Sequence, residues 1–159
     1  MEASRTLGEL LRARGLTIAT AESCTGGAIA AAITAIPGAS DYFPGGIVSY
    51  SIPVKMALLG VPQAVIENDG VVSAACAAAM AASARRVLRA DLALATTGIA
   101  GPGGAEPDKP VGTVHLALAS ADREPVCRHK VYAGDRAAVI AAATHDALAL
   151  ALAYLQGTL

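Results

Sequence analysis

Residues 19–27 read Ala19-Thr20-Ala21-Glu22-Ser23-Cys24-Thr25-Gly26-Gly27. A short apolar, β-branched run precedes them and a second apolar run, residues 28–36, follows, which predicts a strand, a tight turn and a helix. Thr25 is a suitable N-cap, and the two glycines leave backbone N–H groups uncovered at the positive end of that helix. Those N–H groups can hold an anion or a developing oxyanion, but a capped helix start without chemistry fits the same residues.

The composition predicts one folded domain over residues 1–159. Apolar residues make up 54% of the chain and charged residues 16%, which argues against disorder. Much of the apolar content is alanine, with four Tyr, one Phe and no Trp, so we expect a core that depends on close backbone approach. Such a chain leaves apolar helix faces for a partner subunit, and we therefore expect a homo-oligomer.

Charge and cysteine content exclude several classes of partner. The net charge of -1 provides no electrostatic footprint for nucleic acid. The longest apolar run, residues 74–82, is too short to span a bilayer, and residues 1–14 carry charges unlike those of a signal peptide. Three scattered cysteines predict neither a disulfide framework nor a metal site. We expect a cytoplasmic protein without a nucleic-acid or membrane partner.

Apolar patterns and turn residues predict an α/β chain with helices on both sides of a mixed sheet. Helices are expected at residues 4–14, 25–35, 51–59, 73–88 and 135–155, and strands at residues 16–21, 47–50, 91–97, 111–119 and 126–132. Ser4, Ser51, Ser73 and Asp135 are the expected N-caps, and residues 61–70 a linker. The last two strands are expected to form a hairpin.

Four residues have side chains that are suited to nucleophilic or acid–base catalysis. Ser23 or Cys24 can act as a nucleophile if a base activates it. Lys55 has apolar neighbours and lies near the N-terminus of its predicted helix, and both effects lower the pKa of a lysine, as a general base requires. A surface lysine with a buried stem fits the same pattern. Tyr50, at the end of the preceding strand, can hydrogen-bond to either group.

A second glycine-rich stretch, residues 98–104, follows the predicted strand at residues 91–97 and reads Gly98-Ile99-Ala100-Gly101-Pro102-Gly103-Gly104. Its backbone N–H groups can receive a phosphate or another anion, with Thr96, Thr97 and Lys109 as helpers. A plain connecting loop is the alternative, although the length and glycine content favour a binding loop.

Four stretches taken together resemble the CinA C-terminal domain family: residues 20–27, 48–61, 97–104 and 109–114. The family includes nicotinamide-nucleotide amidohydrolases. The resemblance implies a three-layer α/β/α sandwich and a deamidation, without metal or cofactor, of nicotinamide mononucleotide to nicotinate mononucleotide and ammonia. It also implies that Ser23 is the nucleophile, Lys55 the base and Tyr50 a group that orients or relays.

The same resemblance suggests where the substrate, a pyridine mononucleotide, binds. The backbone around Cys24, Thr25, Gly26 and Gly27 is expected to stabilise the oxyanion. Phosphate or ribose contacts are expected from Thr97, Gly98, Gly101, Gly103, Lys109 and Arg136.

Three positions depart from the family pattern. Ile52, Ala74 and Ile140 each replace a polar or charged residue. They favour an alternative of a different class, a catalytically silent nucleotide-binding or oligomerisation module of the same fold. A serine–lysine hydrolase of a related amide is a further possibility.

Overall fold

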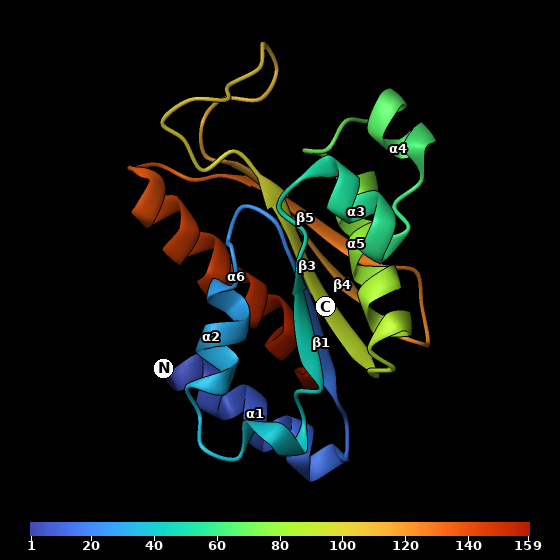
Figure 1. Ribbon diagram of the computed structural model, residues 1–159. Helices are drawn as coiled ribbons and strands as arrows, with labels where there is room; N and C mark the ends of the chain where they lie inside the picture. The colour runs from blue at the N-terminus through green and yellow to red at the C-terminus, as the bar shows by residue number, and fades with distance from the viewer.

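The computed structural model describes residues 1–159 and places a five-stranded mixed sheet between two layers of helices (Figure 1). The strand order is β2-β1-β3-β4-β5. The strands are β1 (Ile18–Glu22), β2 (Gly45–Val48), β3 (Leu92–Gly98), β4 (Thr113–Ala119) and β5 (Val126–Val131). β1 pairs in parallel with β2 and β3, while β4 runs antiparallel to β3 and β5. The predicted α/β/α sandwich and its final hairpin are confirmed.

The helices divide between the two faces of the sheet (Figure 1). One layer contains α1 (Glu2–Arg14), α2 (Ala28–Thr34) and α6 (Arg136–Gln156). The other contains α3 (Ile52–Leu59), α4 (Gln63–Asn68) and α5 (Ala74–Val87), and a short 3₁₀ helix, Ala39–Asp41, precedes β2. α6 is long and apolar enough to cross a membrane, but its interior residues pack in the core against the sheet, α1 and α2.

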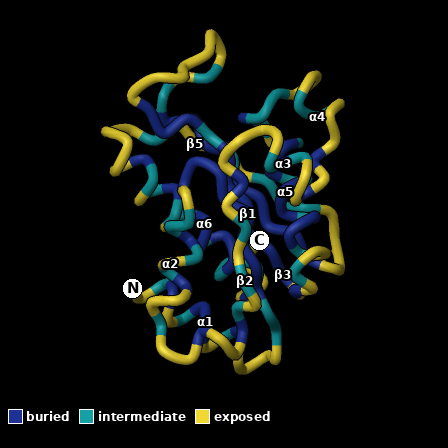
Figure 2. The backbone as a smooth tube through the Cα atoms, in the orientation of Figure 1, coloured by how far each residue is buried: buried dark blue, intermediate teal, exposed yellow.

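The two faces of the sheet have different cores, and the central strands β1, β3 and β4 are largely buried (Figure 2). The core facing α5 has ten alanines among its 14 buried residues, so the helix approaches the sheet closely. The core facing α6 has 21 buried residues and is dominated by leucine and isoleucine. The expected alanine core therefore occupies one face only.

Several predicted caps and boundaries are wrong. Ser4 is buried within α1, which begins two residues earlier than its predicted cap. Residues 61–70 contain α4, and β2 lies two residues before the predicted strand at residues 47–50. Ser51 precedes α3 but makes no capping hydrogen bond through its side chain. The expected caps Ser73 and Asp135 are confirmed, because they accept from the N–H groups of Cys76 and Ala138.

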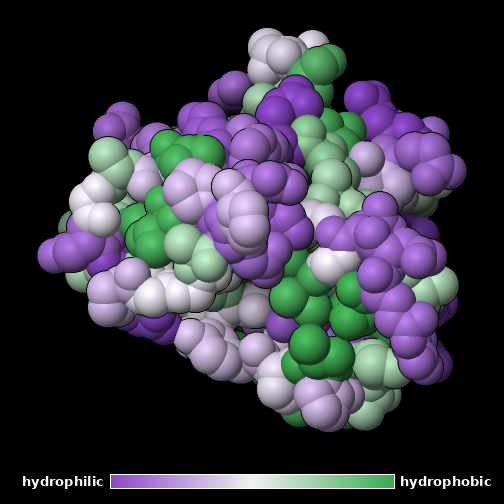
Figure 3. Space-filling model, turned by 90° about the horizontal axis from the view of Figure 1, so that it is seen from above, coloured by the Kyte–Doolittle hydropathy of each residue, from purple (hydrophilic) through white to green (hydrophobic).

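The topology creates a place for a ligand at one end of β1. The chain leaves β1 through α2 on one face and leaves β2 through α3 to α5 on the other, so β2 and β3 lie on opposite sides of β1. In open α/β sheets, ligands bind at the carboxyl ends of the strands beside such a reversal. Figure 3 looks onto this end of the molecule, where hydrophilic and hydrophobic side chains are interspersed.

Candidate active site

Ser23 lies directly after β1, at the carboxyl end of the strand. Its backbone N–H donates to the Thr96 carbonyl at 3.0 Å, which holds it against β3. Its Oγ lies 2.9 Å from Lys55 Nζ. The residue is 8% exposed and lines a cavity, so its hydroxyl group combines a defined position with access to a ligand.

Lys55 reaches Ser23 from α3 and is only 2% exposed. Its ammonium group donates to the Ser49 carbonyl at 2.7 Å and lies 3.5 Å from the Tyr50 carbonyl. Burial lowers the pKa of Lys55, and the nearby thiols of Cys76 and Cys24 oppose this shift. The predicted lowered pKa is therefore supported by the geometry, and the interpretation as a surface lysine is wrong.

The buried Lys55 is expected to make stability depend on pH. Its pKa in the folded protein lies below the ordinary lysine value of 10.5, so between the two values the unfolded chain binds more protons. The free energy of unfolding of the wild type should therefore rise with pH through that window, relative to Lys55→Met, and the difference should be constant below it. Urea unfolding of both proteins over a pH series checks this, and parallel pH profiles would contradict it.

The neighbouring thiol is a poor nucleophile. Burial raises the pKa of Cys24 to about 11, so at neutral pH the group is a thiol and not the reactive thiolate. Lys55 Nζ makes its hydrogen bond to Ser23 Oγ. Of the two nucleophiles that the sequence left open, the geometry favours Ser23.

The N-terminus of α2 is occupied by a side chain of the protein itself. Glu22, which is fully buried, accepts hydrogen bonds from the N–H groups of Gly27, Ile29 and Ala30 and from the Thr25 hydroxyl. Thr25 is therefore not the N-cap, which is Gly27 in a left-handed conformation with φ 102°. The expectation that Gly26 and Gly27 present free N–H groups is wrong, because Gly26 N–H bonds to the Ser23 carbonyl.

Two other N–H groups of the turn remain available. Those of Cys24 and Thr25 donate to no other residue, unlike those of the next two residues. They follow Ser23 directly, which is where an oxyanion formed by attack of its Oγ requires donors. Of the four residues predicted to stabilise an oxyanion, only these two keep an N–H group without a partner residue, and only Cys24 lines the cavity.

A cavity of about 260 Å³ opens beside Ser23. Its walls come from the ends of β1 and β3, from α3, from the segment before α5 and from the start of α6. Nine predicted site residues line it: Ser23, Cys24, Tyr50, Lys55, Thr97, Gly98, Gly101, Gly103 and Arg136. Thr25, Gly26, Gly27 and Lys109 do not.

Arg136 spans the outer part of the cavity. Its guanidinium group donates to the Tyr50 hydroxyl at 2.6 Å and to the Gly101 carbonyl at 2.9 Å. Tyr50 is 56% exposed, and its hydroxyl contacts Arg136 and not Ser23 or Lys55. The Tyr50 hydroxyl therefore lies beside Arg136, and it makes no hydrogen bond through which it could relay a proton between Ser23 and Lys55.

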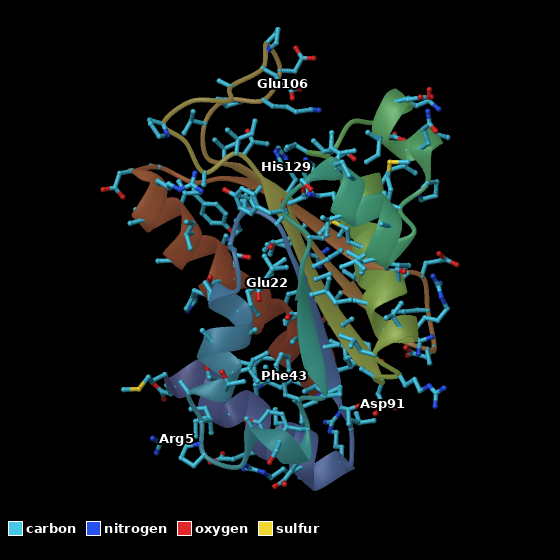
Figure 4. All side chains as sticks on the ribbon, viewed as in Figure 1. Arg5, Glu22, Phe43, Asp91, Glu106 and His129 are labelled. Carbon is cyan, nitrogen blue, oxygen red and sulfur yellow. The ribbon has the colours of Figure 1, made fainter.

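The remaining candidates have other surroundings. Lys109 forms an ion pair with Glu106 at 3.3 Å, in the loop between β3 and β4 and outside the cavity lining. Figure 4 labels Glu106 near the tip of this loop. Among the three departures from the family pattern, only Ile52 lines the cavity. Ala74 is exposed at the start of α5, and Ile140 packs from α6 against the larger core.

Val71 and Val72 form a further wall of the cavity, which was not predicted from the sequence. These residues follow the stretch interpreted as a linker, and Thr97 Oγ1 donates to the Val71 carbonyl at 2.6 Å. That single hydrogen bond ties the segment to the end of β3. No local pattern in the sequence indicates it, because the two partners are 26 residues apart.

The histidines make contacts of their own. His115 and His129 stack with ring centroids 4.6 Å apart, and His145 lies against Asp146. His129 is labelled in Figure 4. No group of three His, Cys, Asp or Glu side chains is arranged to hold a metal ion. Lys55 is thus the basic side chain that hydrogen-bonds to Ser23 Oγ.

The fold and this cavity define an α/β/α sandwich with a buried serine–lysine pair at the carboxyl ends of its parallel strands. The family model for the CinA C-terminal domain matches residues 1–155. The chain belongs to the CinA C-terminal domain family.

Relatives of known name fall into two groups by length. Nicotinamide-nucleotide amidohydrolase PncC of Escherichia coli K12 is 45% identical over 148 residues, which cover 93% of this chain and 90% of that protein. A CinA-like protein of Geobacter metallireducens is 53% identical over 133 residues, covering 82% of this chain but 32% of that protein. The chain therefore spans about a third of the length of several curated relatives that it matches.

Solved structures of the superfamily have the same architecture. A CinA superfamily protein from Klebsiella pneumoniae superposes with a TM-score of 0.94 at 33% identity, covering 98% of this chain and 97% of that one. A competence/damage inducible protein from Agrobacterium tumefaciens gives a TM-score of 0.93 at 38% identity, covering 98% of this chain and 94% of its own.

Proposed function

We propose that this protein is an amidohydrolase that converts nicotinamide mononucleotide to nicotinate mononucleotide and ammonia, and so returns the nucleotide to NAD synthesis. The observation that carries the proposal is the buried contact of 2.9 Å between Lys55 Nζ and Ser23 Oγ at the wall of a cavity. The 45% identity to an enzyme named for this reaction supports the choice of substrate.

Lys55 is the general base in this proposal. In its neutral form the amine can donate one N–H to the Ser49 carbonyl and another toward the Tyr50 carbonyl, which leaves its lone pair directed at the Ser23 hydroxyl. Ser23 Oγ attacks the carboxamide carbon while its proton passes to Lys55. The oxyanion is stabilised by the N–H group of Cys24, which lines the cavity.

Collapse of this intermediate breaks the C–N bond. Lys55 returns its proton to the leaving nitrogen, which departs as ammonia, and the pyridine carbonyl remains as an ester of Ser23. A water molecule then attacks the ester with Lys55 again accepting a proton, and that proton returns to Ser23 Oγ as the carboxylate product leaves. One lysine thus serves both half-reactions, because it alternates between its neutral and protonated forms.

The outer part of the cavity would bind the rest of the nucleotide. Arg136 is positioned to bind the phosphate, with the Tyr50 hydroxyl and the backbone of residues 101–104 beside it. The apolar side chains of Ile52, Val71 and Val72 offer a surface for the pyridine ring. In this arrangement Tyr50 contributes to binding, while Thr97 acts by fixing the Val71 segment.

Replacing Arg136 with methionine is expected to weaken binding of the phosphate. A charge-assisted hydrogen bond contributes about 1.5–3 kcal/mol, so KM for nicotinamide mononucleotide should rise about 10- to 150-fold with a smaller effect on kcat. The phosphate-free nicotinamide riboside should lose little of whatever turnover it has. Steady-state ammonia release checks this, with Arg128→Met, an exposed arginine of β5, as the control. An equal KM for the nucleotide in wild type and Arg136→Met would contradict it.

The proposal is tested by measuring ammonia release from nicotinamide mononucleotide, nicotinamide riboside and nicotinamide by the purified protein. Release from the mononucleotide alone, or much faster from it, is expected. Binding of the mononucleotide by calorimetry without any release would instead favour the silent nucleotide-binding module, with Ile52 the first suspect because it lines the cavity. Release from a different amide only would indicate a serine–lysine hydrolase of another substrate.

We further propose a cytoplasmic location, which the three unpaired cysteines support. We also propose that residues 1–159 form one domain and that the protein is a homo-oligomer. Gel filtration with light scattering measures the molar mass in solution and so tests the oligomeric state.

A further inference from the structure

Glu22 is a buried carboxylate with an unusually complete set of partners. Oε2 accepts from Thr25 Oγ1 at 2.7 Å and from the N–H groups of Gly27 and Ile29 at 3.0 Å, and Oε1 accepts from the Ala30 N–H at 2.8 Å. Figure 4 labels Glu22 in the interior, close to α2. A buried carboxylate is stable when its oxygens are hydrogen-bonded, and the positive end of a helix favours it further.

These bonds close a loop around Ser23. Glu22 is the residue before Ser23, and its side chain binds residues after Ser23, so the five residues between Glu22 and Ala28 cannot extend. Thr25 Oγ1 also lies 2.7 Å from Thr96 Oγ1, and Thr96 is the residue whose carbonyl accepts the Ser23 N–H. The turn is therefore fixed both to α2 and to β3.

Glu22 does not line the cavity. A change there can alter the direction of Ser23 Oγ, and the N–H groups that follow it, without removing a contact to a ligand. Misplacing a catalytic group by about 1 Å can cost about 100-fold in rate.

We propose that Glu22 is a positioning residue: its carboxylate holds the turn after β1 so that Ser23 Oγ faces Lys55 Nζ. The inference rests on the proposed role of Ser23 as the nucleophile and adds a residue that acts only through it. Glu22 has no role in binding the substrate.

The decisive variant is Glu22→Gln, which keeps the size of the side chain. In either orientation of the glutamine amide, its NH₂ group faces at least one of the N–H donors. At least one of the four hydrogen bonds that Glu22 accepts is therefore lost. The readout is the rate at which a fluorophosphonate probe labels Ser23, in which the Oγ–P bond forms, the P–F bond breaks and Lys55 takes the hydroxyl proton. Labelling reports the reactivity of Ser23 whatever the natural substrate is.

Asp91→Asn is the matched control. Asp91 accepts hydrogen bonds at 2.8 Å from the backbone N–H and the hydroxyl of Thr17, the residue that precedes β1. Figure 4 labels Asp91 at this end of the sheet, opposite to the end that bears Ser23. This variant also converts a carboxylate that holds β1 into an amide, but far from Ser23. Thermal unfolding of both variants measures what each costs in stability.

The expected result is that folded Glu22→Gln labels about 100-fold more slowly, while Asp91→Asn labels at the wild-type rate. With nicotinamide mononucleotide, kcat should fall and KM should not change. If Glu22→Gln does not fold, Thr25→Val removes one of the four hydrogen bonds to Glu22 and should give a smaller fall in labelling.

Labelling at the wild-type rate by the folded variant would overturn the role of Glu22 and leave the proposed function intact. A rise in KM without a fall in labelling would overturn it too, because Glu22 would then act on binding. A wild-type protein that takes no label would refute Ser23 as the nucleophile, and both proposals with it.

Discussion

Replacing Ser23 with alanine is expected to abolish ammonia release from nicotinamide mononucleotide, lowering kcat by about 10⁴-fold or more. The variant lacks the only protein atom that forms a covalent bond to the substrate in the proposed reaction, and Lys55 is left without the hydroxyl group that it activates. The measurement is coupled detection of ammonia under saturating substrate, together with calorimetric titration of the nucleotide. Binding should be nearly unchanged, because a single buried hydroxyl is lost.

Ser83→Ala provides the control for that experiment. Ser83 is 3% exposed in α5 and accepts a hydrogen bond from Arg86, so the same atom is deleted in an equally buried place outside the cavity. It should retain wild-type turnover. Turnover that persists in Ser23→Ala would remove Ser23 from the mechanism, and loss of turnover in both variants would point to a general effect on folding.

Replacing Lys55 with methionine is expected to lower kcat at neutral pH by about 10²- to 10⁴-fold, which is the contribution typical of general acid–base catalysis. Methionine has a similar length and fills the apolar site, and it removes the cost of burying an ammonium ion. It leaves the Ser49 carbonyl without its partner, so the two effects on stability oppose each other. The fold should persist, which circular dichroism and thermal unfolding would check.

Lys130→Met separates this effect from the loss of any lysine. Lys130 is an exposed residue of β5 that pairs with Asp146 at 2.6 Å, away from the cavity. Its replacement should leave kcat unchanged. In the wild type, the rate should increase with pH as Lys55 becomes neutral, and burial moves this rise to lower pH by lowering the pKa of Lys55. A Lys55→Met variant with full activity would refute its role as the base.

Most of the fold follows from local patterns in the sequence. Helix α5 and its cap Ser73, the cap Asp135 of α6 and the hairpin of β4 and β5 all lie where periodicity and turn residues predict them. Errors occur where a tertiary contact replaces a local one. Thr25 has the chemistry of an N-cap, but Glu22 reaches over it and takes the N–H groups of α2.

The residue types of the candidate site were predictable from the sequence, but most of the contacts between them were not. Ser23 and Lys55 are 32 residues apart, and neither spacing nor composition places them in contact; the resemblance to a family did. Tyr50 was predicted to hydrogen-bond to one of them, but its hydroxyl accepts a hydrogen bond from Arg136, which is 86 residues away. Contacts between loops at the ends of different strands depend on sheet order, and local sequence does not determine that order.

The difference between the two cores gives the two sides of the molecule opposite sensitivities to change. Between α5 and the sheet, the ten alanines allow a close approach, so an added methyl group there is expected to push the helix away from the strands. Between α6 and the sheet, leucines and isoleucines fill the core, and replacing them with smaller residues is expected to lower the free energy of unfolding. Since α3 rests on α5, a displaced α5 would carry Lys55 with it. Substitution of alanines distant from the cavity is therefore expected to change the distance between Lys55 and Ser23.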